Sequence, residues 1–262
     1  MTEPLGPKNQ LVQQARAIAR ERKEREATGL AHLEGIRLAE EAMAARVDLT
    51  YALYSDDILR RERGEALLAA IRARGVETHR VTPEALERAA DTQTPQGIVA
   101  LFRPRPRTIA EMGPGLVVVL DNLQDPGNLG TVIRSLEALG GAGAVVSGGV
   151  DPYNPKVIRG AMGSLFRLPV VKQSLEQALD ELAQQGRKLY VADAGGDLLP
   201  WQAGLAGGAA LVIGNEGAGP SALARSRADG VISIPMEGPT ESLNAGVAAS
   251  LLIYEALRQR RG

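Results

Sequence analysis

The stretch "IPMEGPTESLNAGV", residues 234–247, leads into a long apolar pattern that predicts the last helix of the chain. Gly238 and Pro239 shape a turn, and Ser242-Leu243-Asn244 then opens the helix. A serine hydroxyl beside the free N–H groups of a helix start can hold a phosphate or a carboxylate. The same serine could instead only cap the helix, which is a common role of serine at this position. Ser242 is therefore a candidate binding residue with capping as its alternative.

A second loop of this kind begins the stretch "LDNLQDPGNLGTVIRSLEALG", residues 120–140. The turn Asp125-Pro126-Gly127 precedes Asn128, which we expect to cap the helix that carries Arg134. Arg134 can be an ordinary surface residue. The flanking Ile133 and Leu136 instead favour a partly buried position, where an unpaired guanidinium is costly.

The third loop lies in "LVIGNEGAGPS", residues 211–221. Its glycines at 214, 217 and 219 allow positive φ and a close approach of backbone to a ligand, although strand-end turns often use glycine without binding anything. The spacing is not that of a phosphate-binding loop, G-x-x-x-x-G-K-[ST]. The chain also lacks G-x-G-x-x-G after the first strand of this half, which disfavours a nicotinamide-dependent dehydrogenase.

The elements that must position these loops alternate between strand and helix. Continuous apolar runs, typical of strands covered on both faces, predict strands at 116–120, 142–147, 188–193, 209–214 and 230–235. Helical patterns fall between them, at about 128–139, 174–185, 219–226 and 243–260. This order predicts a parallel sheet with helices on both faces, and such sheets bind ligands at the carboxyl ends of their strands.

The first part of the chain reads as a separate, small α/β domain. Prolines and arginines alternate in "RPRPRTIAEMGPG", residues 103–115, which predicts a linker. We therefore expect a domain at residues 1–107 and a second at 108–262. In the first, strands are predicted at 30–34, 49–54, 75–81 and 96–102, and helices at 8–26, 36–45, 63–74 and 82–90, the last capped by Thr82.

Composition removes several classes of function. The 262 residues include no cysteine, which excludes thiol chemistry and a Cys-based zinc site. The only histidines are His32 and His79, which disfavours a Ser-His-Asp triad. No apolar run suits a membrane helix, and the first residues lack the apolar segment of a signal peptide, so a cytoplasmic setting is expected. Residues 1–107 carry 18 Lys and Arg against 16 Asp and Glu, a weak basic bias that suits either RNA or a solvated helix face.

The three loops together resemble the signature motifs of the SpoU (TrmH-like) family of RNA ribose 2′-O-methyltransferases, in the same order and spacing. The matching residues are Asn128…Gly130…Arg134 (motif 1), then Gly214-x-Glu216-x-x-Gly219 (motif 2), then Ile234-Pro235-Met236-x-Gly238…Ser242-Leu243-Asn244 (motif 3). In the first half, "HLEGIRLAEEAM" and "TPQGIVALF" resemble the substrate-binding domain of many members, which is similar to an RNA-binding ribosomal protein. Ala161, where a serine is common, and "NAGVAAS" in place of "N-V-S-V-A" depart from the family and bear on local packing.

The resemblance implies a C-terminal α/β domain with a deep trefoil knot and a homodimer with its active site at the subunit interface. It also implies S-adenosylmethionine, bound in the knot without any metal. The residues implied to hold the cofactor are Gly214, Gly219, Ile234, Met236 and Leu243. Those implied to be catalytic are Arg134, assisted by Asn128, Glu216, Ser242 and Asn244.

The reaction implied is methyl transfer to a ribose 2′-hydroxyl of structured RNA, with 23S ribosomal RNA as the expected substrate. The family proposal makes Arg134 the base, although a guanidinium has a pKa above ~12. Arg134 could instead orient the hydroxyl and a phosphate while a phosphate oxygen or water takes the proton. Transfer RNA as substrate, and a non-catalytic RNA-binding or ribosome-assembly factor, are the alternatives.

Overall fold

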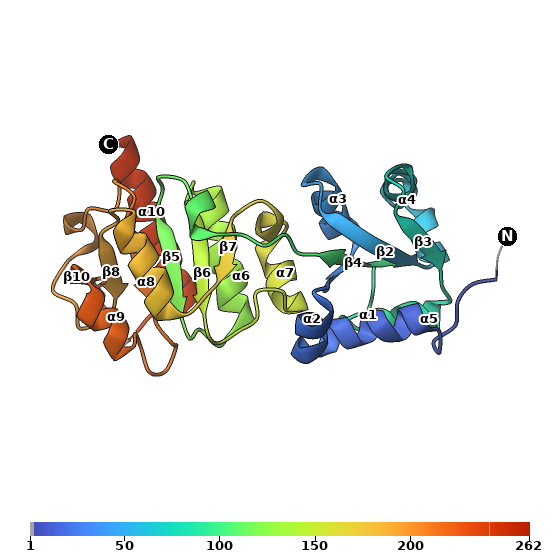
Figure 1. Cartoon of the computed structure of the whole chain (residues 1–262), viewed down its shortest axis with the longest axis horizontal. Coiled ribbons are helices and arrows are strands. Elements are labelled where there is room, and N and C mark those ends of the chain that lie inside the picture. The colour runs from blue at the N-terminus through green and yellow to red at the C-terminus, as the bar shows by residue number, and fades with distance from the viewer. Residues whose placement is uncertain (1–2, 241) are drawn as a thin grey trace. The chain divides into compact units, whose positions relative to one another are not determined.

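The structure, a computed structural model, describes residues 3–240 and 242–262 and forms two compact units (Figure 1). The first unit runs to Arg105 and also contains Tyr153–Phe166. The second unit consists of Pro106–Pro152 and Arg167–Gly262. The break near residue 105 falls within the predicted linker, whereas the sequence did not single out Tyr153–Phe166 as a part of the first unit.

The first unit is built on a four-stranded mixed sheet in the order β1-β4-β2-β3, in which β4 runs antiparallel to β1 and β2. Its strands are β1 (Ala31–Glu34), β2 (Asp48–Tyr54), β3 (Glu77–Arg80) and β4 (Ile98–Arg103). Its helices are α1 (Gln10–Arg20), α2 (Arg22–Thr28), α3 (Ile36–Ala44), α4 (Glu62–Ala73), α5 (Pro83–Ala89) and α7 (Pro155–Ala161). Short 3₁₀ turns lie at Asp56–Arg60 and Ser164–Phe166.

The helix predicted at 8–26 is two helices, because the backbone is extended at Glu21, with φ −114° and ψ 114°. The buried Arg25 donates to the carbonyl oxygens of Ile18 and Ala19, at 2.8 and 3.4 Å, and so satisfies the end of α1. The predicted cap of α5 is confirmed, since the Thr82 hydroxyl accepts the N–H of Ala85 at 3.2 Å.

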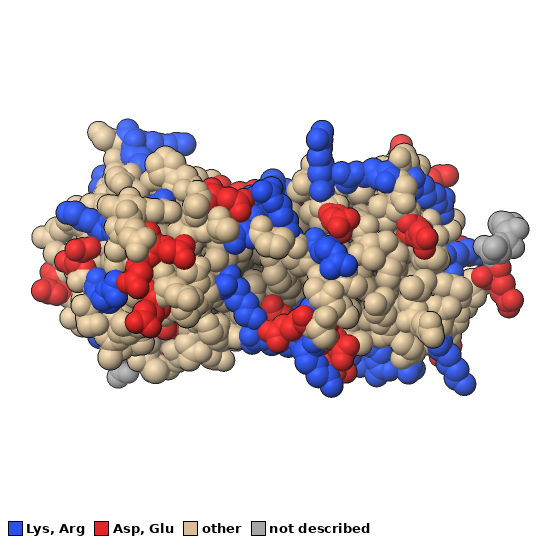
Figure 2. Space-filling view, in the orientation of Figure 1, with Lys and Arg blue, Asp and Glu red and all other residues tan. Residues whose placement is uncertain are grey.

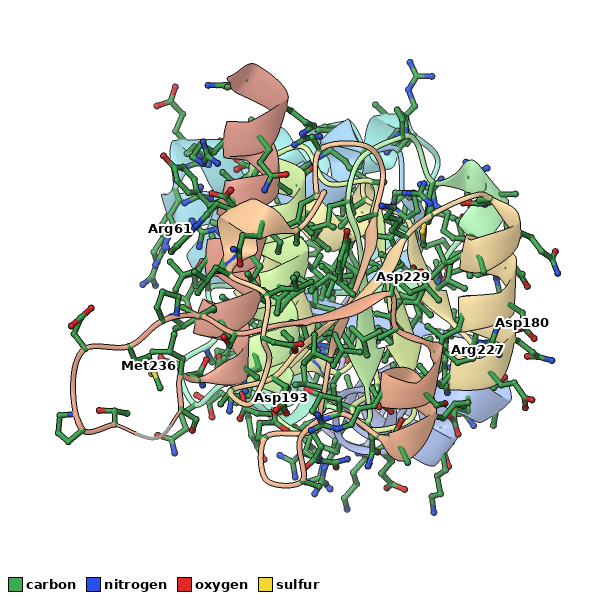
Figure 3. All side chains as sticks on the ribbon, turned by 90° about the vertical axis from the view of Figure 1, so that its left-hand side faces the viewer. Arg61, Asp180, Asp193, Arg227, Asp229 and Met236 are labelled. Carbon is green, nitrogen blue, oxygen red and sulfur yellow. The ribbon has the colours of Figure 1, made fainter. Side chains whose placement is uncertain are left out.

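The second unit contains the predicted parallel sheet, with strand order β10-β8-β9-β5-β6-β7. Its strands are β5 (Val117–Asp121), β6 (Gly143–Ser147), β7 (Val170–Lys172), β8 (Leu189–Ala192), β9 (Ala210–Ile213) and β10 (Gly230–Ile232). Its helices are α6 (Pro126–Ala138), α8 (Leu175–Gln184), α9 (Ala222–Arg227) and α10 (Ala245–Arg261), with 3₁₀ turns at Ile109–Glu111 and Pro200–Gln202. Helices cover both faces, with α8 and α10 on opposite sides of the sheet (Figure 3).

Packing of α6 against α10 fixes where the site residues lie. Near one end of the helix pair, Arg260 of α10 donates to the carbonyl oxygens of Leu139 and Gly140, which end α6, at 2.7 and 2.6 Å. Between the helices, the hydroxyls of Ser135 and Ser250 hydrogen-bond at 2.8 Å. These contacts hold the helix that carries motif 1 beside the helix that follows motif 3.

Among the described helices, none is long and apolar enough to cross a membrane.

Candidate functional site

A cavity of about 540 Å³ opens at the carboxyl ends of β8, β9 and β10 and at the start of α10. Eight of the ten site residues expected from the sequence line it: Gly214, Glu216, Gly219, Ile234, Met236, Ser242, Leu243 and Asn244. The volume falls within the ~300–1,000 Å³ of small-molecule and cofactor sites. Asn128 and Arg134 are not among the lining residues. Motifs 2 and 3 therefore build one pocket, and motif 1 lies outside its wall.

Motif 2 forms a tight turn around Asn215. Asn215 and Gly219 exchange backbone hydrogen bonds of 3.1 and 2.9 Å, and the Asn215 Oδ1 accepts the N–H groups of Gly217 and Ala218 at 2.9 Å each. This fold brings the backbone at Gly219 onto Gly214, where an added Cβ would lie 2.1 Å from the Pro220 nitrogen. The close approach leaves room only for glycine at position 214. Asn215 is also a lining residue that the sequence did not propose as part of the site.

Glu216 connects motif 2 to motif 1. Its carboxylate accepts the backbone N–H groups of Gln124 and Asp125 and the side-chain amide of Asn128, each at 3.0 Å. Burial acts to raise the pKa of Glu216, but these three hydrogen bonds and one from its own backbone N–H outweigh it and hold the pKa below its usual value. An ionised Glu216 thus fixes the loop that precedes α6.

The expectation that Asn128 caps α6 is wrong. The helix begins at Pro126, and its N-cap is Asp125, whose Oδ1 accepts the Asn128 N–H at 2.9 Å. Proline favours the first helical position because its missing N–H is not needed there, and this places the cap one residue earlier, at the aspartate. Asn128 lies in the first turn, 6% exposed, with its amide held by Glu216.

Arg134 is exposed, contrary to the expected partly buried position. Ile133 and Leu136 are buried as expected, but α6 turns Arg134 to the solvent-facing side. Within the described part of the chain, no hydrogen bond or ion pair engages its guanidinium. The structure therefore leaves Arg134 accessible to a further molecule and does not place it in the cavity of its own chain.

Asn244, rather than Ser242, is the N-cap of α10. The Asn244 Oδ1 accepts the N–H groups of Gly246 and Val247 at 3.0 and 3.2 Å. Ser242 lies two residues before this cap, in the cavity wall. Gly246 packs closely on motif 1, since a Cβ there would lie 3.2 Å from the Asn128 Oδ1. The starts of α6 and α10 are therefore in contact.

Replacing Asn244 with alanine should lower the unfolding free energy of the second unit by about 1 kcal/mol, because it removes the cap of α10. Ser242→Ala should change it by less than about 0.5 kcal/mol, as is usual for a surface residue outside a cap. The single tryptophan, Trp201, lies in this unit, so the change in its fluorescence in urea reports the unfolding of the second unit. Equal losses in the two variants would contradict the assignment of the cap.

Asp193 is a lining residue that the sequence did not propose. It directly follows β8, and its Oδ2 pairs with Arg225 of α9 at 2.6 Å. Burial acts to raise the pKa of Asp193, but the hydrogen bonds from Arg225 and from the Gly195 N–H outweigh it, so the pKa is below its usual value. The signal in the sequence was its place at the end of a predicted strand, the edge where parallel sheets bind ligands.

The charges of the cavity wall have one sign. Asp193 and Glu216 line it, and the described residues of the wall include no lysine, arginine or histidine. Most of the remaining lining residues are aliphatic, among them Ile213, Ile232 and Ile234. The cavity therefore suits a ligand that is partly apolar and carries positive charge.

Comparisons with known proteins agree with these features. A profile of the SpoU rRNA Methylase family matches residues 115–254, and a profile of the MRM3-like substrate binding domain matches residues 9–100. The chain is 33% identical to the 23S rRNA (guanosine(2553)-2′-O)-methyltransferase RlmP of Bacillus subtilis over 89% of this chain and 90% of that protein.

Solved structures give the same result. The SpoU methyltransferase AviRb from Streptomyces viridochromogenes, in complex with the cofactor AdoMet, has a TM-score of 0.87 and 31% identity, covering 97% of this chain and 99% of that chain. An AdoMet-bound rRNA methyltransferase from Sinorhizobium meliloti has a TM-score of 0.86 and 26% identity, covering 98% of each. With a profile spanning more than half of the chain and a relative aligned over most of it, this protein belongs to the SpoU rRNA methylase family.

Proposed function

We propose that this protein transfers a methyl group from S-adenosylmethionine to a ribose 2′-hydroxyl of 23S ribosomal RNA, in the cytoplasm. The observation that carries the proposal is the single cavity into which motifs 2 and 3 bring eight site residues. Its volume, aliphatic walls and two carboxylates fit a nucleoside that bears a sulfonium cation. The relatives named above support ribosomal RNA as the substrate class.

Bound S-adenosylmethionine would supply an electrophilic methyl group. The backbone of Gly214 and Gly219 and the side chains of Ile234, Met236 and Leu243 would hold it, and the apolar wall would keep water from the methyl group. Holding donor and hydroxyl together supplies a large part of such an acceleration. Glu216 and Asn244 would act through their hydrogen bonds, by fixing the starts of α6 and α10.

Arg134 would contact the RNA and orient the reacting hydroxyl. Its exposure and its freedom from carboxylates of the described chain suit a phosphate contact. An exposed guanidinium can make a two-pronged contact with an RNA phosphate, which supports the orienting role over the role of base. A phosphate oxygen or water would then take the proton.

The experiment is transfer of tritiated methyl groups from S-adenosylmethionine to purified 23S ribosomal RNA and to transfer RNA, followed by mapping of the labelled nucleotide. We expect label on a ribose 2′-oxygen of 23S ribosomal RNA. Label confined to transfer RNA would move the substrate to the alternative class. No transfer to either RNA, together with no binding of the donor, would leave a non-catalytic RNA-binding factor.

We infer that residues 1–107 bind RNA and that residues 108–262 form a knotted methyltransferase domain. The MRM3-like profile over residues 9–100 supports the first inference, as does the α/β architecture expected for a fold similar to an RNA-binding ribosomal protein. On the face drawn in Figure 2, Lys and Arg lie among Asp and Glu over this unit, which suits scattered contacts to phosphates. Family membership supports the trefoil knot.

We also propose that the protein is a homodimer through α10. Val247, Leu251 and Tyr254 follow one another at helical spacing and are 47%, 46% and 57% exposed. An apolar stripe of this kind marks an interaction surface. A homodimer with its active site at the subunit interface would also explain why Arg134 lies outside the cavity of its own chain. In such a dimer, residues of both subunits would complete each site.

Leu251→Asp should convert the dimer to a monomer, since a buried carboxylate at an apolar interface is costly. Sedimentation velocity measures the change, and methyl transfer should fall with it. Arg261→Gln, a change at the exposed end of the same helix, serves as the control. A Leu251→Asp variant that still sediments as a dimer would rule out this face.

A further inference from the structure

Asp193 occupies a distinct position in the cavity wall. It follows β8 directly, and its Oδ1 accepts the N–H of Gly195 at 2.9 Å while its Oδ2 accepts from Arg225 at 2.6 Å. The Asp193 side chain is 21% exposed and that of Arg225 is 44% exposed. Asp193 lines the cavity and Arg225 does not. The end of β8 thus brings one negative charge to the cavity wall, and the arginine that pairs with it is not part of that wall.

The ion pair is packed against the motif 2 turn. A Cβ placed on Gly219 would lie 3.5 Å from the Asp193 Oδ2 and 3.7 Å from the Arg225 Nη2. Figure 3 shows Asp193 and Met236 toward the same edge of the second unit, where the loops of the cavity meet. A charge at position 193 would therefore lie close to a ligand held by the turn at Gly214–Gly219.

The other carboxylate of the wall is already engaged. Glu216 accepts three N–H groups of the loop before α6, from Gln124, Asp125 and Asn128. Asp193 accepts one side chain and one backbone N–H, and a carboxylate has about four lone-pair sites. Asp193 therefore keeps more free acceptor capacity than Glu216, whose carboxylate is largely occupied by the loop before α6.

We propose that Asp193 makes the cavity discriminate between the positively charged methyl donor and its neutral thioether product, and that Arg225 limits the strength of this discrimination. The inference rests on the proposed function. Donor and product differ by the methyl group and by the unit charge on sulfur, so a fixed carboxylate stabilises the donor more than the product. The partial neutralisation by Arg225 keeps the donor from being held more tightly than turnover allows.

The test is isothermal titration of the full-length protein with S-adenosylmethionine and with S-adenosylhomocysteine, from which the ratio of the product Kd to the donor Kd is calculated. Asp193→Asn should lower this ratio by about threefold to tenfold, the effect of one charge at a partly exposed site. Arg225→Gln should raise the ratio, because it leaves Asp193 without its neutralising partner. The two variants break the same ion pair, yet the expected shifts are opposite.

Asp180 and Arg227 supply a matched control. They form a second ion pair between α8 and α9, away from the cavity-lining residues, and both are labelled in Figure 3. Asp180→Asn removes a carboxylate from an arginine of the same helix α9 and should leave the Kd ratio unchanged.

Each outcome has one interpretation. Opposite shifts for Asp193→Asn and Arg225→Gln support the proposal. Shifts of the same sign, or equal losses of donor and product affinity, would show that the ion pair only holds α9 in place and would overturn it. Wild-type protein that binds neither ligand would instead refute the proposed function.

Discussion

Arg134→Ala should bind S-adenosylmethionine with unchanged affinity and lose methyl transfer by at least about 100-fold, as expected when a group that orients the reactants is removed. Arg134 does not line the cavity, so donor binding has no reason to change. Its exposure on α6 and its lack of partners in the described chain leave it available to RNA and to the reacting hydroxyl. Single-turnover transfer of labelled methyl, together with calorimetry of the donor, separates the two effects.

Thr131→Ala is the control for this experiment. Thr131 is also exposed on α6, one helical turn from Arg134, so the two share a face of the helix. We expect normal turnover from Thr131→Ala and little recovery in Arg134→Lys, because an ammonium cannot make the two-pronged contact of a guanidinium. An Arg134→Ala variant with near-normal turnover would remove Arg134 from the mechanism.

Apolar patterns predicted the second unit well because its strands are buried on both faces. Strand β5 is buried from Val117 to Asp121. A continuous apolar run of this kind predicts a buried strand even when the neighbouring strands are not known. The same reasoning missed β7, Val170–Lys172, because three residues are too few to show a period. It also missed α7, a seven-residue helix whose segment joins the first unit.

The sequence was enough to propose which residues belong to the site, but not to predict how they are arranged. Local pattern could not decide whether Asp125 or Asn128 caps α6, since both are good caps three residues apart. The exposure of Arg134 depends on which face of α6 meets α10, a long-range contact that no local motif encodes. Asp193 was missed for a similar reason, because only the folded sheet brings the end of β8 beside the turn at Gly219.

Gly214→Ala should abolish measurable donor binding and destabilise the second unit. The new Cβ would lie 2.1 Å from the Pro220 nitrogen and 2.2 Å from the Gly219 carbonyl carbon, both of them backbone atoms that no rotamer change can move. The turn from Asn215 to Gly219 must therefore open. Overpacking costs about 1–3 kcal/mol even where side chains can adjust, so a larger loss is expected here.

Gly217→Ala tests whether this loss belongs to the close approach rather than to glycine in the loop. A Cβ at Gly217 would meet only the Asn215 Oδ1, at 3.6 Å, and the Gly217 backbone lies outside the left-handed region. We expect this variant to bind the donor and to unfold in urea like the wild type, with Trp201 fluorescence as the readout. If Gly214→Ala bound the donor as Gly217→Ala does, the motif 2 backbone would not form the cofactor wall. Comparison of the two variants therefore tests whether the pocket depends on the contact between Gly214 and the turn that ends at Pro220. The glycines in the sequence suggest such a contact but do not establish it.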